Sequence, residues 1–284
     1  MADITKKLND LADSIEGILD YAGIQNVHYA EIGQSMPRGS NFSDCDRIAV
    51  PLDGVHRMQT VCDGEVVTIK PVPGEVTFMP TGIWNYPDWE LPVRVATLGF
   101  QDDYTWISYV NCNGKENASK AVYRMRIAPL SDDSAILKTA VKAFKSGNQS
   151  VGKCLLEALL YCCTGSMKKG VWSSSSTGKA AGTWRHINDY LEENYSCEIC
   201  REDISQEFKL SPNYISCLCR SQTGMSFITY LNKIRIDKAC FLLREYDQTL
   251  DEIAFNAGFS STAYFCRVFK QLLKKTPFEY RNSR

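Results

Sequence analysis

The last third of the chain contains two stretches that resemble each other, and this repeat constrains the fold more than any other feature. The first stretch spans residues 203–220 and the second spans residues 252–270. Each begins with an acidic residue and apolar residues, passes through a turn that contains serine, and ends in a segment with tyrosine, two spaced apolar residues and a basic residue. Such a repeat indicates two copies of one supersecondary unit.

Each copy carries the local signals of a helix, a turn and a second helix. In the first copy, Ser211 can cap the second helix, Pro212 suits its first turn, and Gly224 suits the position just past its end. In the second copy, residues 249–252 form a capping box for the leading helix, and Gly258 lies where a left-handed backbone is expected. Both copies are therefore predicted to be helix-turn-helix units.

The segment between the copies is predicted to be one long helix. Residues 226–245 lack glycine and proline and carry apolar residues along one side. A helix of about 20 residues is about 30 Å long, which is close to one turn of DNA, about 34 Å. A spacer of this length would place two recognition helices in successive segments of the major groove.

Short motifs at fixed spacings give this region a family resemblance. They occupy residues 210–214, 223–227, 230–232, 235–236, 242–243, 253–254, 258–260, 264–265, 267–270, 276–277 and 280–281. With these motifs, residues 184–284 resemble the DNA-binding domain of the AraC/XylS family of bacterial transcription regulators. The resemblance implies a sequence-specific regulator that binds a double-stranded DNA operator, and RNA polymerase as a partner if the protein is an activator.

The second segment of each copy divides into two faces at about 100° per residue. One face is apolar and is expected to point toward a core, with Ile215, Leu218 and Cys219 in the first copy and Phe265, Val268, Phe269 and Leu272 in the second. The other face supplies the predicted DNA contacts, and the resemblance implies the same positions: Asn213, Ser216, Cys217, Arg220, Thr262, Ala263, Cys266, Arg267 and Lys270.

Side-chain chemistry assigns roles within this set. Arg267 carries a fork of donors that fits guanine O6 and N7, and Asn213 carries an amide that pairs with adenine. The other basic and hydroxyl side chains suit phosphates or base edges. Cys217 departs from the family, which often has a basic or polar residue there. We therefore expect the second copy to make most of the base contact that comes from arginine.

Two further residues carry separate expectations. Lys274 stands where the family commonly has glycine after the second recognition helix, and a left-handed lysine costs on the order of 1 kcal/mol. Arg235 has two interpretations: it is a structural tie between the spacer helix and a neighbour, or it has a functional role.

The N-terminal part has a different pattern. Residues 1–20 have helical apolar spacing, and short apolar runs from about 26 to 127, broken by turn signals such as Asp53-Gly54 and Asp63-Gly64, predict strands. The helical period returns in residues 132–145 and 151–163. These two helices are predicted to pack together, and they are expected either to form a homodimer contact or to pack only within the chain.

These patterns predict an α+β chain of two domains. Residues 1–165 are predicted to be a cupin-like, ligand-sensing and possible dimerisation domain: a β-rich barrel or sandwich followed by helices. This follows from a resemblance of 74–80 and the aromatic segment 84–89 to the sensor domains of AraC-type regulators. The Ser-, Gly- and Lys-rich residues 166–182 are predicted to be a flexible linker, and residues 183–284 an all-α DNA-binding domain with two helix-turn-helix units joined by a long helix.

A small-molecule effector is the predicted ligand of the N-terminal domain, because small barrels of this kind hold ligands at their mouths. The candidate residues are His56, Arg57, Trp84, Tyr86 and Trp89. Aromatic rings stack on sugar faces, and arginine binds carboxylates or hydroxyls. A core or interface role for Trp84 and Trp89 is an equally good interpretation.

Composition excludes or limits other classes of protein. The chain has three histidines and no His-x-His pair, so neither a metal-dependent cupin enzyme nor any bound metal or cofactor is expected. Cys197-x-x-Cys200 is one pair and does not make a zinc site. Most of the 12 cysteines are expected to be structural thiols. Cys217 and Cys266 leave open a redox- or metal-responsive regulator, because both lie on predicted DNA faces.

The expected location is the cytoplasm, with no membrane partner. The N-terminus has no apolar stretch of a signal peptide, and no run approaches the length of a membrane span. The formal net charge of −1 argues against a general polycation, although the end of the chain is locally basic.

Overall fold

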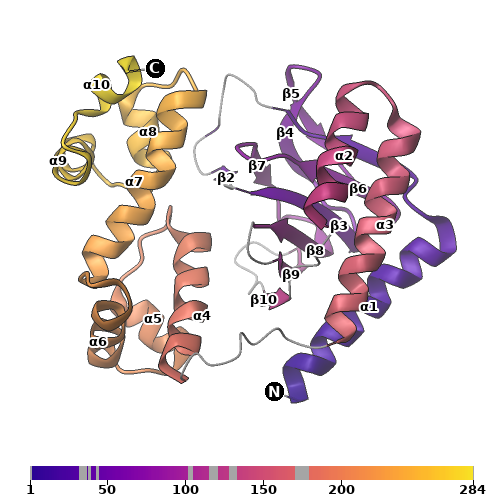
Figure 1. The fold of residues 1–284 in the computed structure, drawn as a ribbon, viewed down its shortest axis with the longest axis horizontal. Coiled ribbons are helices and arrows are strands. Elements are labelled where there is room, and N and C mark those ends of the chain that lie inside the picture. The colour runs from indigo at the N-terminus through magenta and orange to yellow at the C-terminus, as the bar shows by residue number, and fades with distance from the viewer. Residues whose placement is uncertain are drawn as a thin grey trace. The chain divides into compact units, whose positions relative to one another are not determined.

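The chain divides into two compact units in a computed structural model (Figure 1). The structure describes residues 2–31, 37, 40–42, 45–101, 105–114, 121–127, 133–169 and 179–283. The first unit comprises Met1–Gly33 and Asn41–Ser173, and the second comprises Gln34–Ser40 and Ser174–Arg284. Among the described helices, none has both the length and the apolar character that crossing a membrane requires.

The first unit is β-rich, as predicted. Its strands are β1 (Asn26–Tyr29), β2 (Asn41–Phe42), β3 (Asp46–Gly54), β4 (Met58–Cys62), β5 (Glu65–Ile69), β6 (Glu75–Met79), β7 (Trp84–Pro87), β8 (Pro92–Phe100), β9 (Thr105–Asn113) and β10 (Ala121–Ile127). They form a six-stranded sheet, in the order β1-β6-β3-β8-β9-β10, and a four-stranded sheet, in the order β2-β7-β4-β5.

The two predicted aspartate–glycine turns differ in structure. Asp63 and Gly64 have φ angles of 52° and 77°, and they connect β4 to β5 as a tight hairpin turn. Gly54 ends β3 beyond a register irregularity between Pro51 and Asp53, so it does not close a tight hairpin. A Cβ atom at Gly54 would lie 2.2 Å from the Pro92 carbonyl oxygen. Glycine is therefore required there because the β8 backbone approaches closely.

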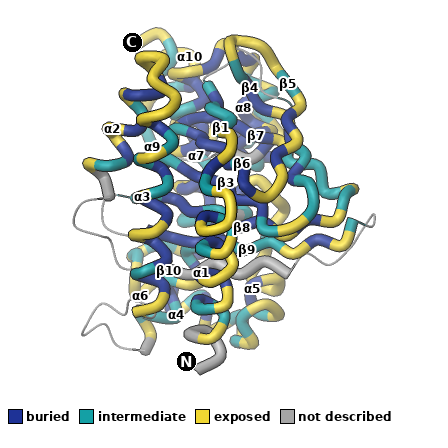
Figure 2. The backbone as a smooth tube through the Cα atoms, turned by 90° about the vertical axis from the view of Figure 1, so that its right-hand side faces the viewer, coloured by how far each residue is buried: buried dark blue, intermediate teal, exposed yellow. Residues whose placement is uncertain are grey.

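Three helices cover one face of the six-stranded sheet: α1 (Ala2–Ala22), α2 (Asp133–Lys145) and α3 (Gln149–Lys168). Helix α3 packs against both α1 and α2 (Figures 1 and 2). All three helices contribute apolar side chains to one core. Strand residues that alternate along the sheet, such as Ile48, Phe78 and Leu98, complete this core. The three helices predicted in this unit are therefore confirmed, and α3 extends beyond its predicted end.

Helices occupy part of the predicted linker, residues 166–182. Helix α3 ends at Lys168, so residues 166–168 are helical. The next helix begins at Lys179, so residues 179–182 are helical as well. Small residues such as Gly182 did not prevent helix formation there, although composition favoured a linker. Residues 170–178 lie outside the described part of the chain.

The second unit is all-α, as predicted. Its helices are α4 (Lys179–Asn194), α5 (Arg201–Phe208), α6 (Pro212–Thr223), α7 (Phe227–Glu245), α8 (Leu250–Asn256), α9 (Thr262–Leu273) and α10 (Pro277–Asn282). The pair α5–α6 is the first helix-turn-helix unit, and the pair α8–α9 is the second. Helix α7 is the predicted spacer.

The predicted capping residues of this unit are confirmed. The Ser211 hydroxyl accepts a hydrogen bond from the Tyr214 amide, and Thr249 and Glu252 form the capping box of α8. Gly224 and Gly258 have φ angles of 73° and 85°, and Lys274 is left-handed at 60°. The same cap position therefore holds glycine after α6 and a strained lysine after α9.

We predict that exchanging these two residues changes stability in opposite directions. Lys274→Gly is expected to raise the free energy of unfolding by about 0.5–1 kcal/mol, because glycine adopts this backbone without steric cost. Gly224→Lys is expected to lower it by a similar amount, since no atom lies within 4 Å of a Cβ built at Gly224 and only the backbone is strained. Urea denaturation measures both values. Equal effects of the same sign would contradict this account.

Candidate nucleic-acid interface

The second recognition helix, α9, separates a buried face from a solvent-facing one. Phe265, Val268 and Phe269 are buried, as the helical periodicity predicted. The predicted DNA contacts lie on the other side of the helix. Among these, Ala263, Arg267 and Lys270 are exposed, while Thr262 and Cys266 are half-buried.

Arg267 is exposed on this face. Its guanidinium lies 5.2 Å from the centre of the Tyr264 ring on the same helix. Within the described part of the chain it forms no ion pair, so its donors remain available to a base or a phosphate. By contrast, the Thr262 hydroxyl donates a hydrogen bond to Asp251 at the start of α8. This contact connects α8 and α9, the two helices of the second helix-turn-helix unit. It also engages the hydroxyl of Thr262, which is one of the predicted DNA contacts.

The first recognition helix, α6, has the same division. Ile215, Leu218 and Cys219 are buried, whereas Asn213, Cys217 and Arg220 are exposed. Ser216 is half-buried, and its hydroxyl donates to the Pro212 carbonyl oxygen at 3.1 Å. The geometry thus brings these predicted contact residues to one face of the helix, although Ser216 is already hydrogen-bonded.

Arg201, at the start of α5, is a residue of this face that the sequence pattern did not indicate. Its Nη1 atom donates to the Ser216 hydroxyl at 3.1 Å. The resemblance between the two copies begins only at residue 203, so the repeat could not bring Arg201 into the comparison. Arg201 also pairs with Glu202 at 3.8 Å, so its positive charge beside α6 is partly offset.

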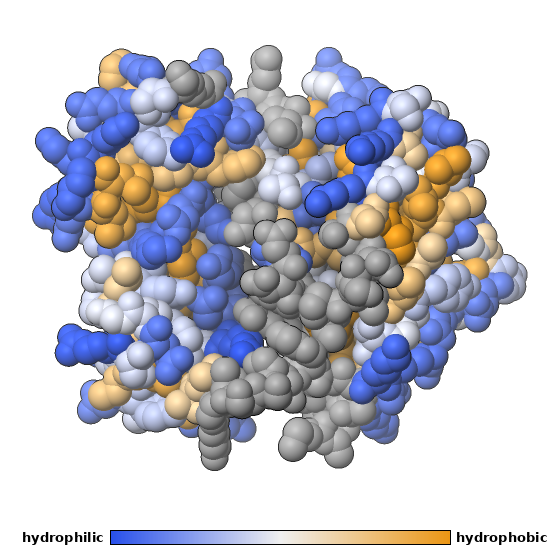
Figure 3. Space-filling model, in the orientation of Figure 1, coloured by the Kyte–Doolittle hydropathy of each residue, from blue (hydrophilic) through white to orange (hydrophobic). Residues whose placement is uncertain are grey.

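The face of this unit that Figure 3 shows is mainly hydrophilic, with apolar areas among the polar ones. The large apolar side chains that are exposed on it are Tyr214, Ile228, Phe255 and Phe278. Scattered apolar residues of this number are ordinary on a protein surface. The exposed basic residues of α6 and α9 are therefore the more specific feature of the unit.

The cysteines show no assembled metal or disulfide site. All twelve are free thiols, and within the described residues no group of three histidine, cysteine or acidic side chains could hold a metal ion. Burial raises the pKa of Cys266, and a hydrogen bond with Asp203 raises the pKa of Cys200. Both thiols therefore stay protonated at neutral pH, which lowers their reactivity.

The five effector candidates of the first unit do not form one continuous set. His56 is buried, and its ring lies 5.7 Å from that of Trp89. Arg57 forms ion pairs with Asp88 and Glu90, which flank Trp89. The remaining two residues are on β7, where Trp84 is fully buried and Tyr86 is exposed.

A row of small side chains crosses the six-stranded sheet on its helix-free face. Strand register aligns Thr77, Ala49, Thr97 and Ser108 on neighbouring strands, and we call these four residues the small-residue row. The Thr77 hydroxyl is fully buried and has no hydrogen-bond partner among the described residues. Strand alternation hinted at such a face, but register was needed to align its members.

A second buried polar group of this unit lacks a partner. Asn85 of the four-stranded sheet is buried, and its Oδ1 atom has no hydrogen-bond partner in the described residues. The hydroxyl of Thr60, in contrast, donates to the Trp84 carbonyl oxygen at 3.0 Å. Buried polar groups without partners are uncommon in folded proteins.

Comparison with known proteins places the second unit among helix-turn-helix domains. A family model described as a helix-turn-helix domain matches residues 204–283. Over 259 residues, 91% of this chain and 88% of the relative, the chain is 28% identical to YijO of Escherichia coli (strain K12), an uncharacterized HTH-type transcriptional regulator. Over 95 residues, 34% of each chain, it is 34% identical to the HTH-type transcriptional activator RhaS of Klebsiella pneumoniae (strain 342).

A solved structure resembles the same region. It is the C-terminal domain of AraT, a response regulator from Geobacillus stearothermophilus, which is 30% identical. The match covers 38% of this chain and 89% of that chain, with a TM-score of 0.36.

We predict that Arg267→Ala weakens binding to a specific DNA duplex by about 1–3 kcal/mol and relaxes the preference for one base. The reason is that Arg267 is exposed, unpaired by any described acid, and able to contact guanine. Fluorescence anisotropy across single-base variants of a selected duplex measures both effects. Lys233→Ala is the control, because Lys233 is exposed on α7 and pairs with Asp237. Unchanged affinity and selectivity of Arg267→Ala would exclude the role.

A second prediction concerns acid sensitivity. Burial lowers the pKa of His56 from 6.5 to about 4, so the unfolded chain binds a proton more readily than the folded one between these values. The stability that neutral His56 provides is present above pH 6.5 and is lost as pH falls toward 4, by on the order of 3 kcal/mol. His56→Phe is expected to flatten this part of the stability profile. An equally steep decline in the variant would contradict the assignment.

Proposed function

We propose that this protein is a DNA-binding transcription regulator with an AraC-type helix-turn-helix domain in its C-terminal part, and that it reads one operator with both recognition helices. The helix-turn-helix family match over residues 204–283 and the regulators among its relatives support this proposal. The observation that carries the proposal is the duplication of an exposed reading face. Helices α6 and α9 each bury their apolar face and expose basic or amide side chains, with Asn213 and Arg220 on α6 and Arg267 and Lys270 on α9.

The spacer supports simultaneous reading by both helices. Helix α7 has 19 residues, which gives a length of about 28 Å. Successive major-groove segments on one face of DNA are about 34 Å apart. A rigid helix of this length therefore suits two contacts on one face of the duplex, with Arg267 as the main arginine contact to a base.

Genomic selection with the purified protein tests this function. Fragments that the protein retains are expected to share a motif with two parts about one helical turn apart. Retention of fragments without a common motif would contradict specific reading. The retained fragments would also identify the operator for later measurements.

The first unit is proposed to bind a small polar effector through the small-residue row. Thr77 has a fully buried hydroxyl without a partner, and Thr97, in the same row, is half-buried and so reaches solvent. Hydroxyl groups on a ligand could donate to and accept from these side chains, so a sugar or another polyhydroxylated compound fits this chemistry. Among the candidates predicted from the sequence, the rings of His56 and Trp89 pack against each other. The charge of the neighbouring Arg57 is already paired with Asp88.

A homodimer contact is proposed on α3. Val151 and Tyr161 are exposed on this helix, with 44% and 41% of their surfaces accessible. The Tyr161 hydroxyl donates to Asp20 of α1 at 2.6 Å, which fixes the ring. Apolar side chains fixed at a surface favour association. Sedimentation of the full-length protein would decide between monomer and dimer, and RNA polymerase is a proposed partner if the regulator is an activator.

A redox-responsive regulator is the alternative, and one observation favours it. Cys217 is exposed on the reading face of α6, where an adduct would stand between the helix and DNA. Burial raises the pKa of the Cys266 thiol, which lowers the reactivity of that residue. Normal DNA binding after alkylation of the protein would exclude this alternative.

We predict that Thr77→Val and Thr60→Val differ in their effect on stability and on ligand binding. Without ligand, Thr77→Val is expected to leave the free energy of unfolding unchanged or raise it, because the hydroxyl it removes has no partner. Thr60→Val is the matched control, and it is expected to lose about 1 kcal/mol because its hydroxyl is hydrogen-bonded. Thermal shift with a library of sugars and polyols measures both properties. An effector that shifts wild type and Thr77→Val equally would exclude the proposed site.

A further inference from the structure

We infer that Arg235 is a positioning residue that fixes the two recognition helices at the separation an operator requires. The inference rests on the proposed reading of one operator by both helices. It concerns a different property of the domain, namely the spacing that the protein accepts between the two parts of its binding site.

Arg235 lies at the centre of α7 and joins parts of both helix-turn-helix units. Its Nε atom donates to the Tyr195 carbonyl oxygen at 2.8 Å, and its Nη2 atom donates to the Cys197 carbonyl oxygen at 2.8 Å. Both carbonyl groups belong to the loop that leads into α5. On the other side, the guanidinium lies 5.7 Å from the centre of the Phe259 ring, which follows α8. One side chain therefore contacts both the loop that precedes the first helix-turn-helix unit and the turn of the second helix-turn-helix unit.

Gly258 brings the turn of the second helix-turn-helix unit directly against the loop that precedes α5. A Cβ atom at this position would lie 2.3 Å from the Tyr195 carbonyl oxygen, 2.9 Å from the Ser196 Cα atom and 3.0 Å from Arg235 Nε. Two of these neighbours are backbone atoms, which cannot move aside as a flexible side chain can. The turn, the loop and the arginine are consequently packed without room for another methyl group.

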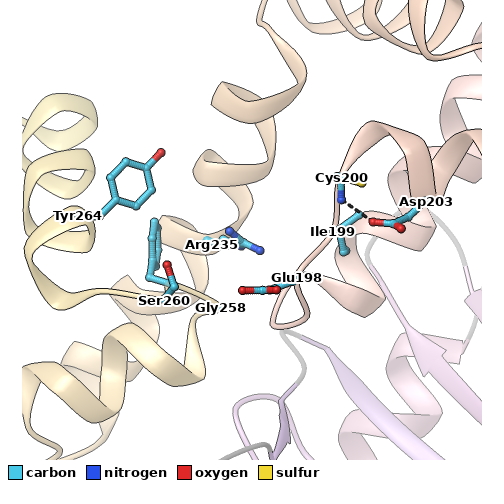
Figure 4. A pocket seen from close by; sticks show the side chains of 9 residues that line it. Glu198, Ile199, Cys200, Asp203, Arg235, Gly258, Ser260 and Tyr264 are labelled. Atoms are coloured by element: carbon cyan, nitrogen blue, oxygen red, sulfur yellow. Dashed lines mark hydrogen bonds between the residues drawn. The ribbon is translucent and has the colours of Figure 1, made fainter.

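Beyond this contact an open cleft of about 470 Å³ lies between the two helix-turn-helix units (Figure 4). One wall of the cleft carries Glu198, Cys200 and Asp203, from the loop before α5 and from α5 itself. The other wall carries Ser260 and Tyr264, from the second helix-turn-helix unit. Figure 4 shows Arg235 extending from α7 between these walls. At this cleft, the contacts of Arg235 and Gly258 connect the two helix-turn-helix units in addition to the continuous helix α7.

A hydrogen bond also connects α7 to the second helix-turn-helix unit. The Nδ2 atom of buried Asn232 donates to the Tyr264 hydroxyl at 2.9 Å. Tyr264 is on α9, next to the reading face that carries Arg267. Asn232 therefore links α7 to the second recognition helix. Arg235, about one turn later, links α7 to the loop before the first helix-turn-helix unit.

The geometry of DNA makes such a connection a determinant of specificity. Adding one base pair between the two parts of an operator moves them apart by about 3.4 Å and rotates them by about 34°. A rigid domain cannot follow this change without losing contacts at one end. A domain whose units turn about α7 can follow it. Loss of the Arg235 contacts should thus broaden the spacings that the protein accepts.

The test uses the full-length protein and a duplex selected from a random-sequence library by the wild type. Binding is measured on that duplex, on duplexes with one base pair inserted or removed between its two parts, and on duplexes with either part scrambled. The variants are Arg235→Lys, which keeps the charge but loses the fork of donors, and Arg235→Ala. Lys233→Ala, two residues earlier on α7, is the matched control, and circular dichroism with thermal unfolding checks folding of every variant.

The wild type and Lys233→Ala are expected to lose about tenfold or more in affinity for the altered spacings. Arg235→Lys is expected to bind the original duplex more weakly, to bind all three spacings within about threefold of one another, and to keep wild-type affinity for duplexes with one part scrambled. A purely structural role would reduce affinity for every duplex by the same factor and retain the spacing preference, which would overturn the inference. A wild type that tolerates all spacings, or needs only one part, would overturn it as well.

Discussion

The second unit depends on one helix that belongs to two cores. The first half of α7 contributes Phe227, Leu231 and Ile234 to a core with α4, α5 and α6. Its second half buries Ala239 and Leu242 where it contacts α8, α9 and α10. Apolar burial stabilises each end separately, so neither helix-turn-helix unit can form its core without the same rigid rod. This sharing means that one continuous helix holds the exposed faces of α6 and α9, which the proposed joint reading of DNA requires.

Local signals sufficed to predict most of this unit because its helices begin and end at chemically distinctive residues. Ser211, Thr249 and Gly224 satisfy or terminate backbone groups within a few residues, so their effect can be deduced without knowledge of the fold. The faces of α6 and α9 follow from helical period alone. A structural tie was one interpretation of Arg235, and its hydrogen bonds confirm that interpretation, but its partners could not be deduced because they lie 38 and 40 residues away in the chain.

The first unit was predictable in class but not in its candidate site. Alternating apolar residues indicated strands, yet the small-residue row emerges only from the pairing of β6, β3, β8 and β9. Aromatic and charged residues drew attention to Arg57 and Trp84, whereas structure pairs the first with carboxylates and buries the second. Non-local register and burial thus decided what composition alone could not. Composition also favoured a longer linker than the helices allow, because propensity is weak next to tertiary contacts.

The left-handed lysine after α9 also has an electrostatic consequence. A helix carries partial negative charge at its C-terminus, which attracts cations. Lys274 and its neighbour Lys275 place two positive charges at this end, whereas Gly224 and Met225 place none after α6. The two recognition helices therefore end with different positive charge. Ionic strength would act more strongly at the end of α9 than at the end of α6, where Arg220 is the exposed cation of the last turn.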